Sequence, residues 1–310
     1  MKILIKQWIR IFLYLFSGTI SIILLTYGIL LLKRSPRSPY QEQLFQGIAY
    51  QRIPHSQPRP FLVHVVTIDL TVPGVKVLVT PGSPAKDGNE FNAQTTGDFL
   101  KTHQLQLAIN GSYFQPFYTK HPLDFYPKSG DRVNVLGQSI SDGIAYSSPQ
   151  GGWNVLCFSP QNRATIESDR CPPDTLQGLA GGYILILEGK PARQYQGREL
   201  TDLYPRMAVG VDRQGQKLWI VAIDGRQPFY SEGVTFPELT KILLELGSDR
   251  ALILDGGGSA TLVVEKEGEM RSLNTPIHTR IPLRQRPVAN HLGFYAKVLN
   301  DRKSLSRSKN

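Results

Sequence analysis

Cysteine is scarce in this chain of 310 residues, which contains only Cys157 and Cys171. Two cysteines without a nearby histidine pair are poor zinc ligands, and the six histidines show no metal-binding spacing. The motifs HExxH, CxxC and GxSxG are also missing. Metal hydrolases and serine hydrolases therefore lose their usual sequence support, and we expect no metal and no cofactor.

The two cysteines leave two alternatives open. In an exported protein, a disulfide between Cys157 and Cys171 would close a loop of about 15 residues and contribute ~3 kcal/mol in the chain-entropy model. In a cytosolic protein the same residues would remain thiols. We expect the disulfide.

Acidic residues are absent from the N-terminal end and scarce at the C-terminal end. The formal net charge of +10 comes from these two ends. Six Lys or Arg precede residue 38, and five follow residue 296 against one Asp. The interval between them has 24 residues of each sign. The globular part is therefore neutral, which argues against a nucleic-acid partner.

One long apolar run is present. Residues 11–32 carry no charge and are long enough to cross a hydrocarbon core of about 30 Å as a helix. The run exceeds the usual length in a cleavable signal peptide and leads directly into Lys33-Arg34. We expect a single-pass membrane anchor with the catalytic domain on the extracytoplasmic side, although the flanking positive charges are balanced and fix no orientation.

The rest of the chain predicts one α+β domain with a mixed central β-sheet and a few packed helices after the transmembrane helix. The expected segments are a basic flank at 1–10, the anchor at 11–32, a proline-containing stalk at 33–59, the domain at 60–297 and a basic tail at 298–310. Apolar runs predict strands at 61–70, 75–80, 105–109, 153–158, 183–188, 207–211, 218–223, 251–254, 261–264 and 292–296. One helix is expected between Thr235 and Gly247, because Thr235 and Glu238 form a capping box before an apolar stripe.

The most informative motif is Asp255-Gly256-Gly257-Gly258-Ser259, set between two expected strands. A hairpin turn would explain one or two glycines. The third glycine and the serine favour a row of backbone N–H groups that binds an anion. A dinucleotide site or P-loop is excluded, because a strand rather than a helix follows the glycines.

Three weaker candidates also end or begin expected strands. The pair Asn110-Gly111 offers an amide that donates and accepts hydrogen bonds, although Asn-Gly alone is usually a turn. Asp224 stands beside Arg226, which alone would suggest a surface ion pair in a turn. Arg206 precedes a strand, and a guanidinium suits phosphate recognition, although single arginines usually lie on the surface.

Taken in order, these pieces resemble the phosphodiester glycosidase family. The matching segments are residues 109–114, Gly181-Gly182, residues 206–210, Asp224-Gly225-Arg226, residues 233–247, residues 255–263 and Asn290. The resemblance covers about residues 60–297 and implies cleavage of the bond between a sugar C1 and a phosphate oxygen. The chain departs from the family pattern at Tyr113 and in the proline-rich stretch 115–130, so the resemblance does not carry sugar specificity.

From the resemblance we expect Asp255 to act as nucleophile or general base and Asp224 to act as second carboxylate or to position the sugar. Arg206, Arg226 and the N–H groups of residues 256–259 would hold the phosphate, and Asn110, Gly111 and Asn290 would bind the substrate. The expected partner is a sugar phosphate or phosphorylated glycan, as in exopolysaccharide. Two alternatives remain: a non-catalytic binding or assembly protein, and a phosphodiesterase that cleaves P–O.

Overall fold

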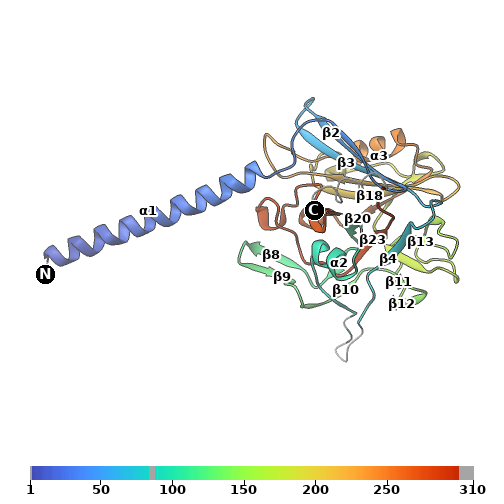
Figure 1. Ribbon diagram of the computed structural model, residues 1–310, viewed down its shortest axis with the longest axis horizontal. Coiled ribbons are helices and arrows are strands. Elements are labelled where there is room, and N and C mark those ends of the chain that lie inside the picture. The colour runs from blue at the N-terminus through green and yellow to red at the C-terminus, as the bar shows by residue number, and fades with distance from the viewer. Residues whose placement is uncertain (1, 84–87, 89, 300–310) are drawn as a thin grey trace, which may run out of the picture.

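A long helix stands apart from a domain built mainly of strands (Figure 1). The computed structural model describes residues 2–83, 88 and 90–299, so most of the expected basic tail lies outside the described residues. Helix α1 spans Lys2–Leu32, and its segment Phe12–Leu32 has a mean hydropathy of 2.1 with no part buried. Length and composition alone make this segment a candidate membrane span.

An eight-stranded sheet forms the first layer of the domain. Its order is β1-β2-β3-β19-β18-β20-β16-β17, and each neighbouring pair is antiparallel. The strands are Tyr40–Phe45, Ile48–His55, Phe61–Asp69, Lys217–Ile223, Arg206–Val211, Arg250–Leu254, Ile184–Leu187 and Lys190–Pro191, in that order.

Two five-stranded sheets lie against this layer. The first has the order β22-β21-β6-β23-β4, with strands Glu269–Ser272, Leu262–Lys266, Leu107–Asn110, His291–Tyr295 and Lys76–Val79. The second has the order β12-β11-β15-β13-β14, with strands Ile144–Ser147, Ser139–Ser141, Gln177–Ala180, Val155–Phe158 and Ala164–Glu167. The fold class is α+β as predicted, but the strands expected in one central sheet divide between these sheets.

The main core lies between the layers because side chains alternate along each strand. In β18, Met207 and Val209 face the core shared with Leu262 and Phe294, whereas Ala208 faces the opposite side. This alternation gives the large sheet two buried faces. The apolar side chains on its second face must therefore pack against another element.

Helices supply the outer cover. Helix α3 (Phe236–Glu245) packs Leu239 and Leu243 on the second face of the large sheet. Its predicted capping box is present, since the Thr235 N–H donates to Glu238 at 2.8 Å. Helix α2 (Thr96–Thr102), which the sequence analysis did not predict, covers the outer face of β6 and β21.

The prediction of a stalk is wrong for residues 40–55. These residues form β1 and β2, and β2 pairs with β3 along its whole length. Ile48 and Tyr50 are buried in the main core, so the domain includes this hairpin. Pro54 is the next-to-last residue of β2, where it pairs with Leu62, and Pro58 lies in the turn to β3; proline is compatible with the end of a strand.

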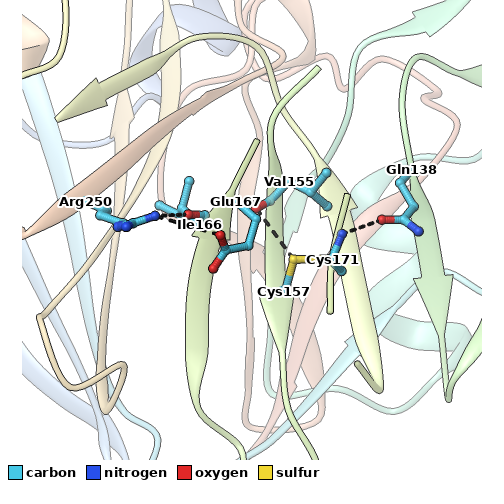
Figure 2. Close-up of a disulfide and its surroundings, with 7 residues drawn as sticks. All are labelled: Gln138, Val155, Cys157, Ile166, Glu167, Cys171 and Arg250. Atoms are coloured by element: carbon cyan, nitrogen blue, oxygen red, sulfur yellow. Dashed lines mark hydrogen bonds and ion pairs between the residues drawn. A yellow bond between two sulfur atoms is a disulfide. The ribbon is translucent and has the colours of Figure 1, made fainter. Parts of the chain in front are cut away.

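Cys157 and Cys171 form a disulfide with a Cα–Cα distance of 5.7 Å, as expected (Figure 2). It joins β13 to the loop before β15. The same loop is held by Gln138, whose Oε1 accepts from the Cys171 N–H at 2.7 Å.

Short strands complete the domain. A three-stranded sheet has the order β5-β10-β7, with strands Phe91–Asn92, Arg132–Val135 and Phe114–Gln115. A separate hairpin consists of β8 (Tyr118–His121) and β9 (Asp124–Tyr126). Three short 3-10 turns are η1 (Gly197–Leu200), η2 (Gly257–Ser259) and η3 (His278–Arg280).

Candidate active site

The glycine loop carries the chain from one sheet to another. Strand β20 before it belongs to the eight-stranded sheet, and β21 after it to a five-stranded one, so the loop is not a hairpin. Gly257 has a φ of +59°, which favours glycine, and a Cβ on Gly258 would lie 2.6 Å from Nη2 of Arg286. The glycines therefore allow the backbone to approach a guanidinium closely.

This loop forms one wall of a cavity of about 730 Å³. The other walls come from the start of β18, the turn after β19, the hairpin β8–β9 and the segment around η3. The lining residues are Tyr113, Phe117, Thr119, Lys120, His121, Pro122, Tyr204, Arg206, Arg226, Asp255, Gly256, Gly257, Gly258, Ile277, Thr279, Arg280 and Arg286. Among these described residues, Asp255 is the sole carboxylate.

Two of the arginines were predicted, and each is held in place. Nε of Arg206 donates to the Val234 carbonyl at 3.2 Å, and its guanidinium lies 4.1 Å from the ring of Phe236. The guanidinium of Arg226 lies 4.5 Å from the ring of Tyr204. Side chains fixed in this way can bind an anion at a lower cost in conformational entropy.

Two more arginines line the cavity, Arg280 and Arg286, and neither was predicted from the sequence. Arg286 is held firmly. Its side chain is largely buried: Nη1 donates to Oγ of Ser259 at 2.9 Å and Nε donates to Nδ1 of His278 at 3.2 Å. Its guanidinium also lies 4.4 Å from the ring of Phe117. In the sequence Arg286 stands in a basic run without a strand or glycine beside it, and its only signal is its closeness to Asn290.

Burial raises the pKa of the Asp255 carboxyl. The positive charge of Arg286, hydrogen bonds from Ser259 and the Gly256 N–H, and the charge of Arg226 act in the opposite direction. Burial also lowers the pKa of Arg206 and Arg286. The cavity therefore combines one destabilised carboxylate with several desolvated cations, an arrangement typical of functional sites.

Tyr113 adds a neutral hydrogen-bonding group to the cavity. Burial, reinforced by the negative charge of Asp255, raises the pKa of its hydroxyl above the ordinary value. Tyr113 therefore keeps its proton at neutral pH and can donate a hydrogen bond to a substrate oxygen.

Asp224 does not line the cavity, and its expected role at the substrate stays a prediction. It is 1% exposed, and Oδ1 accepts from the Thr275 N–H at 2.8 Å. Oδ2 lies 3.2 Å from Nε2 of His64, whose Nδ1 is hydrogen-bonded to the Tyr50 hydroxyl at 2.8 Å. A buried carboxylate requires such partners, so Asp224 fixes the loop after β22 against β19.

The predicted substrate-binding residues Asn110, Gly111, Asn290 and Ser259 also do not line the cavity. Nδ2 of Asn110 donates to the Asp255 carbonyl at 2.7 Å, and its Oδ1 accepts from the Thr261 N–H at 3.0 Å. The Gly111 carbonyl accepts from the Asp255 N–H at 3.2 Å. These contacts hold both ends of the glycine loop.

Asn290 supports the same region from behind. Its Oδ1 accepts from the Ser112 N–H at 2.8 Å, and the Gly111 N–H donates to its carbonyl at 3.0 Å. A Cβ on Gly111 would lie 2.5 Å from Oδ1 of Asn290. The two asparagines thus position the loop, and their expected contact with substrate stays a prediction.

His278 positions Arg286. Burial, followed by the charges of Arg286 and Arg284, lowers the pKa of His278 to about 3. The ring is therefore neutral at pH 7, and its Nδ1 can accept the bond from Arg286.

In the part of the chain that the structure describes, no group of three or more His, Cys, Asp or Glu side chains is arranged to hold a metal ion.

Comparison with known proteins reveals two relatives by sequence. The uncharacterized SPbeta prophage-derived protein YomE of Bacillus subtilis is 30% identical over 152 residues, which cover 44% of this chain and 23% of YomE. The bovine N-acetylglucosamine-1-phosphodiester alpha-N-acetylglucosaminidase is 26% identical over 200 residues, which cover 60% of this chain and 36% of the bovine protein. The chain thus spans well under half the length of either relative.

Solved structures share the fold. A hypothetical protein from Synechocystis superposes with a TM-score of 0.62 and 16% identity, covering 85% of this chain and 64% of that chain. The zebrafish N-acetylglucosamine-1-phosphodiester alpha-N-acetylglucosaminidase catalytic domain, auto-inhibited by its pro-peptide, gives a TM-score of 0.56 and 21% identity, covering 86% and 85%. The model of the phosphodiester glycosidase family matches residues 103–295, more than half of the chain. The chain therefore belongs to the phosphodiester glycosidase family of hydrolases.

Proposed function

We propose that the chain hydrolyses a sugar 1-phosphodiester by cleaving the C1–O bond. The observation that carries this proposal is the composition of the cavity, which is lined by one carboxylate, the glycine loop and four arginines, Arg206, Arg226, Arg280 and Arg286. Guanidiniums suit a phosphate, whereas the expected backbone donors are largely occupied, since the Gly257 N–H donates to the Pro205 carbonyl and the Ser259 N–H to the Gly256 carbonyl. Asp255 alone supplies a carboxylate at the same place.

The phosphate lies against the arginines, because the Gly256 N–H already bonds to the Asp255 carboxylate and the Gly257 N–H donates to the Pro205 carbonyl at 2.8 Å. Guanidinium forks match phosphate oxygens, and desolvated cations interact with them more strongly than cations in water. The sugar then lies toward Tyr113, whose hydroxyl donates to a sugar oxygen. This orientation places C1 between Asp255 and the bound phosphate.

Asp255 attacks C1 or activates the water that does. A glycosidase usually needs a second carboxyl group to protonate the leaving oxygen. A phosphate monoester is a better leaving group than an alcohol, since its second pKa is near ~6. The arginines stabilise the charge that develops on it, so one carboxylate suffices.

The proposal includes the cellular setting. Helix α1 anchors the chain in a membrane, and the domain lies on the extracytoplasmic side, where it acts on a cell-surface glycan or glycoconjugate. The apolar segment Phe12–Leu32 supports the anchor. The disulfide Cys157–Cys171 supports an oxidising compartment.

The test uses the full-length chain in detergent with the methyl phosphodiester of N-acetylglucosamine 1-phosphate. The proposal predicts that N-acetylglucosamine and methyl phosphate are released. Mass spectrometry detects both products. Retention or inversion at C1, read by NMR, then separates attack by Asp255 from activation of water. Binding of the diester without any hydrolysis would instead identify a non-catalytic binding protein.

A further inference from the structure

The end of α1 is fixed directly to the domain. Oγ of Ser35 donates to the Leu273 carbonyl at 2.8 Å, and the Tyr230 hydroxyl donates to the Ser35 carbonyl at 2.8 Å. The guanidinium of Arg34 lies 4.1 Å from the ring of Tyr230. Only Lys33 separates Leu32, the last residue of α1, from Arg34, the first residue in these contacts. The domain is therefore not on a long tether.

One chain segment joins this attachment to the cavity. Leu283 lines a hollow together with residues 33–36 at the end of α1. Thr279 and Arg280, a few residues earlier, line the cavity that contains Asp255. The attachment of α1 and the cavity wall therefore lie on the same side of the domain.

The hairpin β8–β9 continues that wall. Nη1 of Arg284 donates to the Pro122 carbonyl at the hairpin turn, at 2.9 Å. Figure 1 shows β8 and β9 at the end of the domain from which α1 leaves. Residues 119–122 line the cavity, so the hairpin is its rim on the α1 side.

The hairpin also exposes apolar side chains. Leu123 at the turn is 84% exposed, and Tyr118 is 44% exposed. Phe117 before the hairpin is 46% exposed. Lys120 lies on β8, and its Nζ pairs with Oδ2 of Asp124 at 3.3 Å. Aromatic and aliphatic residues beside lysine are typical of protein surfaces at a membrane interface.

We propose that the substrate is a lipid-linked sugar 1-phosphodiester, presented by the bilayer that α1 spans, and that the hairpin β8–β9 rests on that bilayer. This inference rests on the proposed function and names its substrate class. The cavity takes the sugar and the phosphate, while the lipid chain leaves past Leu123 and Tyr118 into the membrane.

The reaction balances as a hydrolysis. The oxygen of water bonds to C1, and the bond between C1 and the phosphate oxygen breaks with its electron pair going to the phosphate. The free sugar gains the hydroxyl at C1, and the lipid phosphate leaves as a monoester. The second proton of water passes through Asp255 to solvent.

The first experiment compares two substrates on the full-length chain reconstituted in vesicles of phosphatidylethanolamine and phosphatidylglycerol. One is the hexadecyl phosphodiester of N-acetylglucosamine 1-phosphate in the vesicles, and the other is the soluble methyl diester. Leu123→Asp should lower the rate on the hexadecyl diester about tenfold and leave the methyl diester unchanged, because aspartate is poorly tolerated in a membrane. Ile144→Asp, at an exposed apolar site on β12, should change neither rate.

The outcomes separate the two proposals. Equal effects of Leu123→Asp and Ile144→Asp on the hexadecyl diester, with normal hydrolysis of the methyl diester, would overturn the lipid-linked substrate and favour a soluble glycan. Failure of wild type on both diesters would overturn the proposed function and the substrate class together.

A second measurement reports on the hairpin without any turnover. Leu123→Cys and Ile144→Cys are each labelled with an environment-sensitive dye, since the native cysteines are joined in a disulfide. Blue-shifted emission in vesicles only at position 123 supports the membrane contact. Identical emission at both positions would overturn it.

Discussion

Asp224 and Asp255 occupy matching places in the eight-stranded sheet but have opposite surroundings. Each follows an apolar strand and precedes a glycine, and the strands β19 and β20 flank β18. Asp224 is enclosed by His64, Tyr230 and the Thr275 N–H. Asp255 faces a cavity with arginines. The same local pattern therefore yields a structural carboxylate in one place and a candidate catalytic one in the other.

The largest expected effect in this comparison comes from Asp255→Asn. If Asp255 supplies the nucleophile or base, kcat should fall by about 10³-fold or more, while the diester still binds. Since burial raises the pKa of Asp255, its ionised form destabilises the fold above the ordinary pKa. The variant should thus have a higher Tm at pH 7. Near-normal hydrolysis would remove Asp255 from the chemistry.

Arg286→Lys should have the next largest effect. A lysine cannot keep the bonds to Ser259 and His278 while presenting a fork to phosphate. We expect kcat/KM to fall about 10²-fold. Arg250→Lys is the matched control, since Arg250 donates to the Ile166 carbonyl outside the cavity (Figure 2). Equal activities of the two variants would exclude Arg286 from the phosphate site.

Asp224→Asn should have the opposite effects to Asp255→Asn: a lower stability and a nearly unchanged activity. The buried bond to His64 is disturbed, and the free energy of unfolding should fall by about 1–3 kcal/mol in urea titrations. The kcat of the folded fraction should stay within about threefold of wild type, because Asp224 does not line the cavity. A stable but inactive Asp224→Asn protein would restore Asp224 as a second catalytic carboxylate.

The smallest effect concerns pH. Because burial raises the pKa of Asp255, protonation on acidification begins at a higher pH than for an ordinary aspartate. The carboxylate is the active form, so kcat/KM should fall with a midpoint above about 3.9. Asp224→Asn should keep this acid limb. A wild-type midpoint at or below the ordinary value would mean that Asp255 is not the titrating group.

Much of the fold could be predicted from the sequence because its signals are local. The capping box of Thr235 and Glu238 predicted α3. Apolar runs predicted most strands of the eight-stranded sheet and of the five-stranded sheet that contains β6. Strand β2 escaped prediction because Pro54 and Pro58 resemble a linker, while its stability comes from pairing with β3. How the strands divide between sheets depends on contacts between distant segments, which local patterns do not encode.

The site divides in the same way. Asp255, Arg206, Arg226 and the glycines were predicted, and the structure brings them to one cavity. Asn110 and Asn290 belong to the same region, but they hold the loop, and Asp224 is buried behind it. Arg286 has little local signature, because its place at the cavity depends on contacts with Ser259 and His278 and on the close approach of Gly258.

Hydrolysis in ¹⁸O-labelled water tests the central claim most directly. The full-length chain is incubated with the methyl phosphodiester of N-acetylglucosamine 1-phosphate, and both products are analysed by mass spectrometry. Our account predicts the label in the sugar, because water or Asp255 attacks C1 and the phosphate leaves with its own oxygen. Label in methyl phosphate, or in N-acetylglucosamine 1-phosphate released together with methanol, would mean P–O cleavage and would contradict the account.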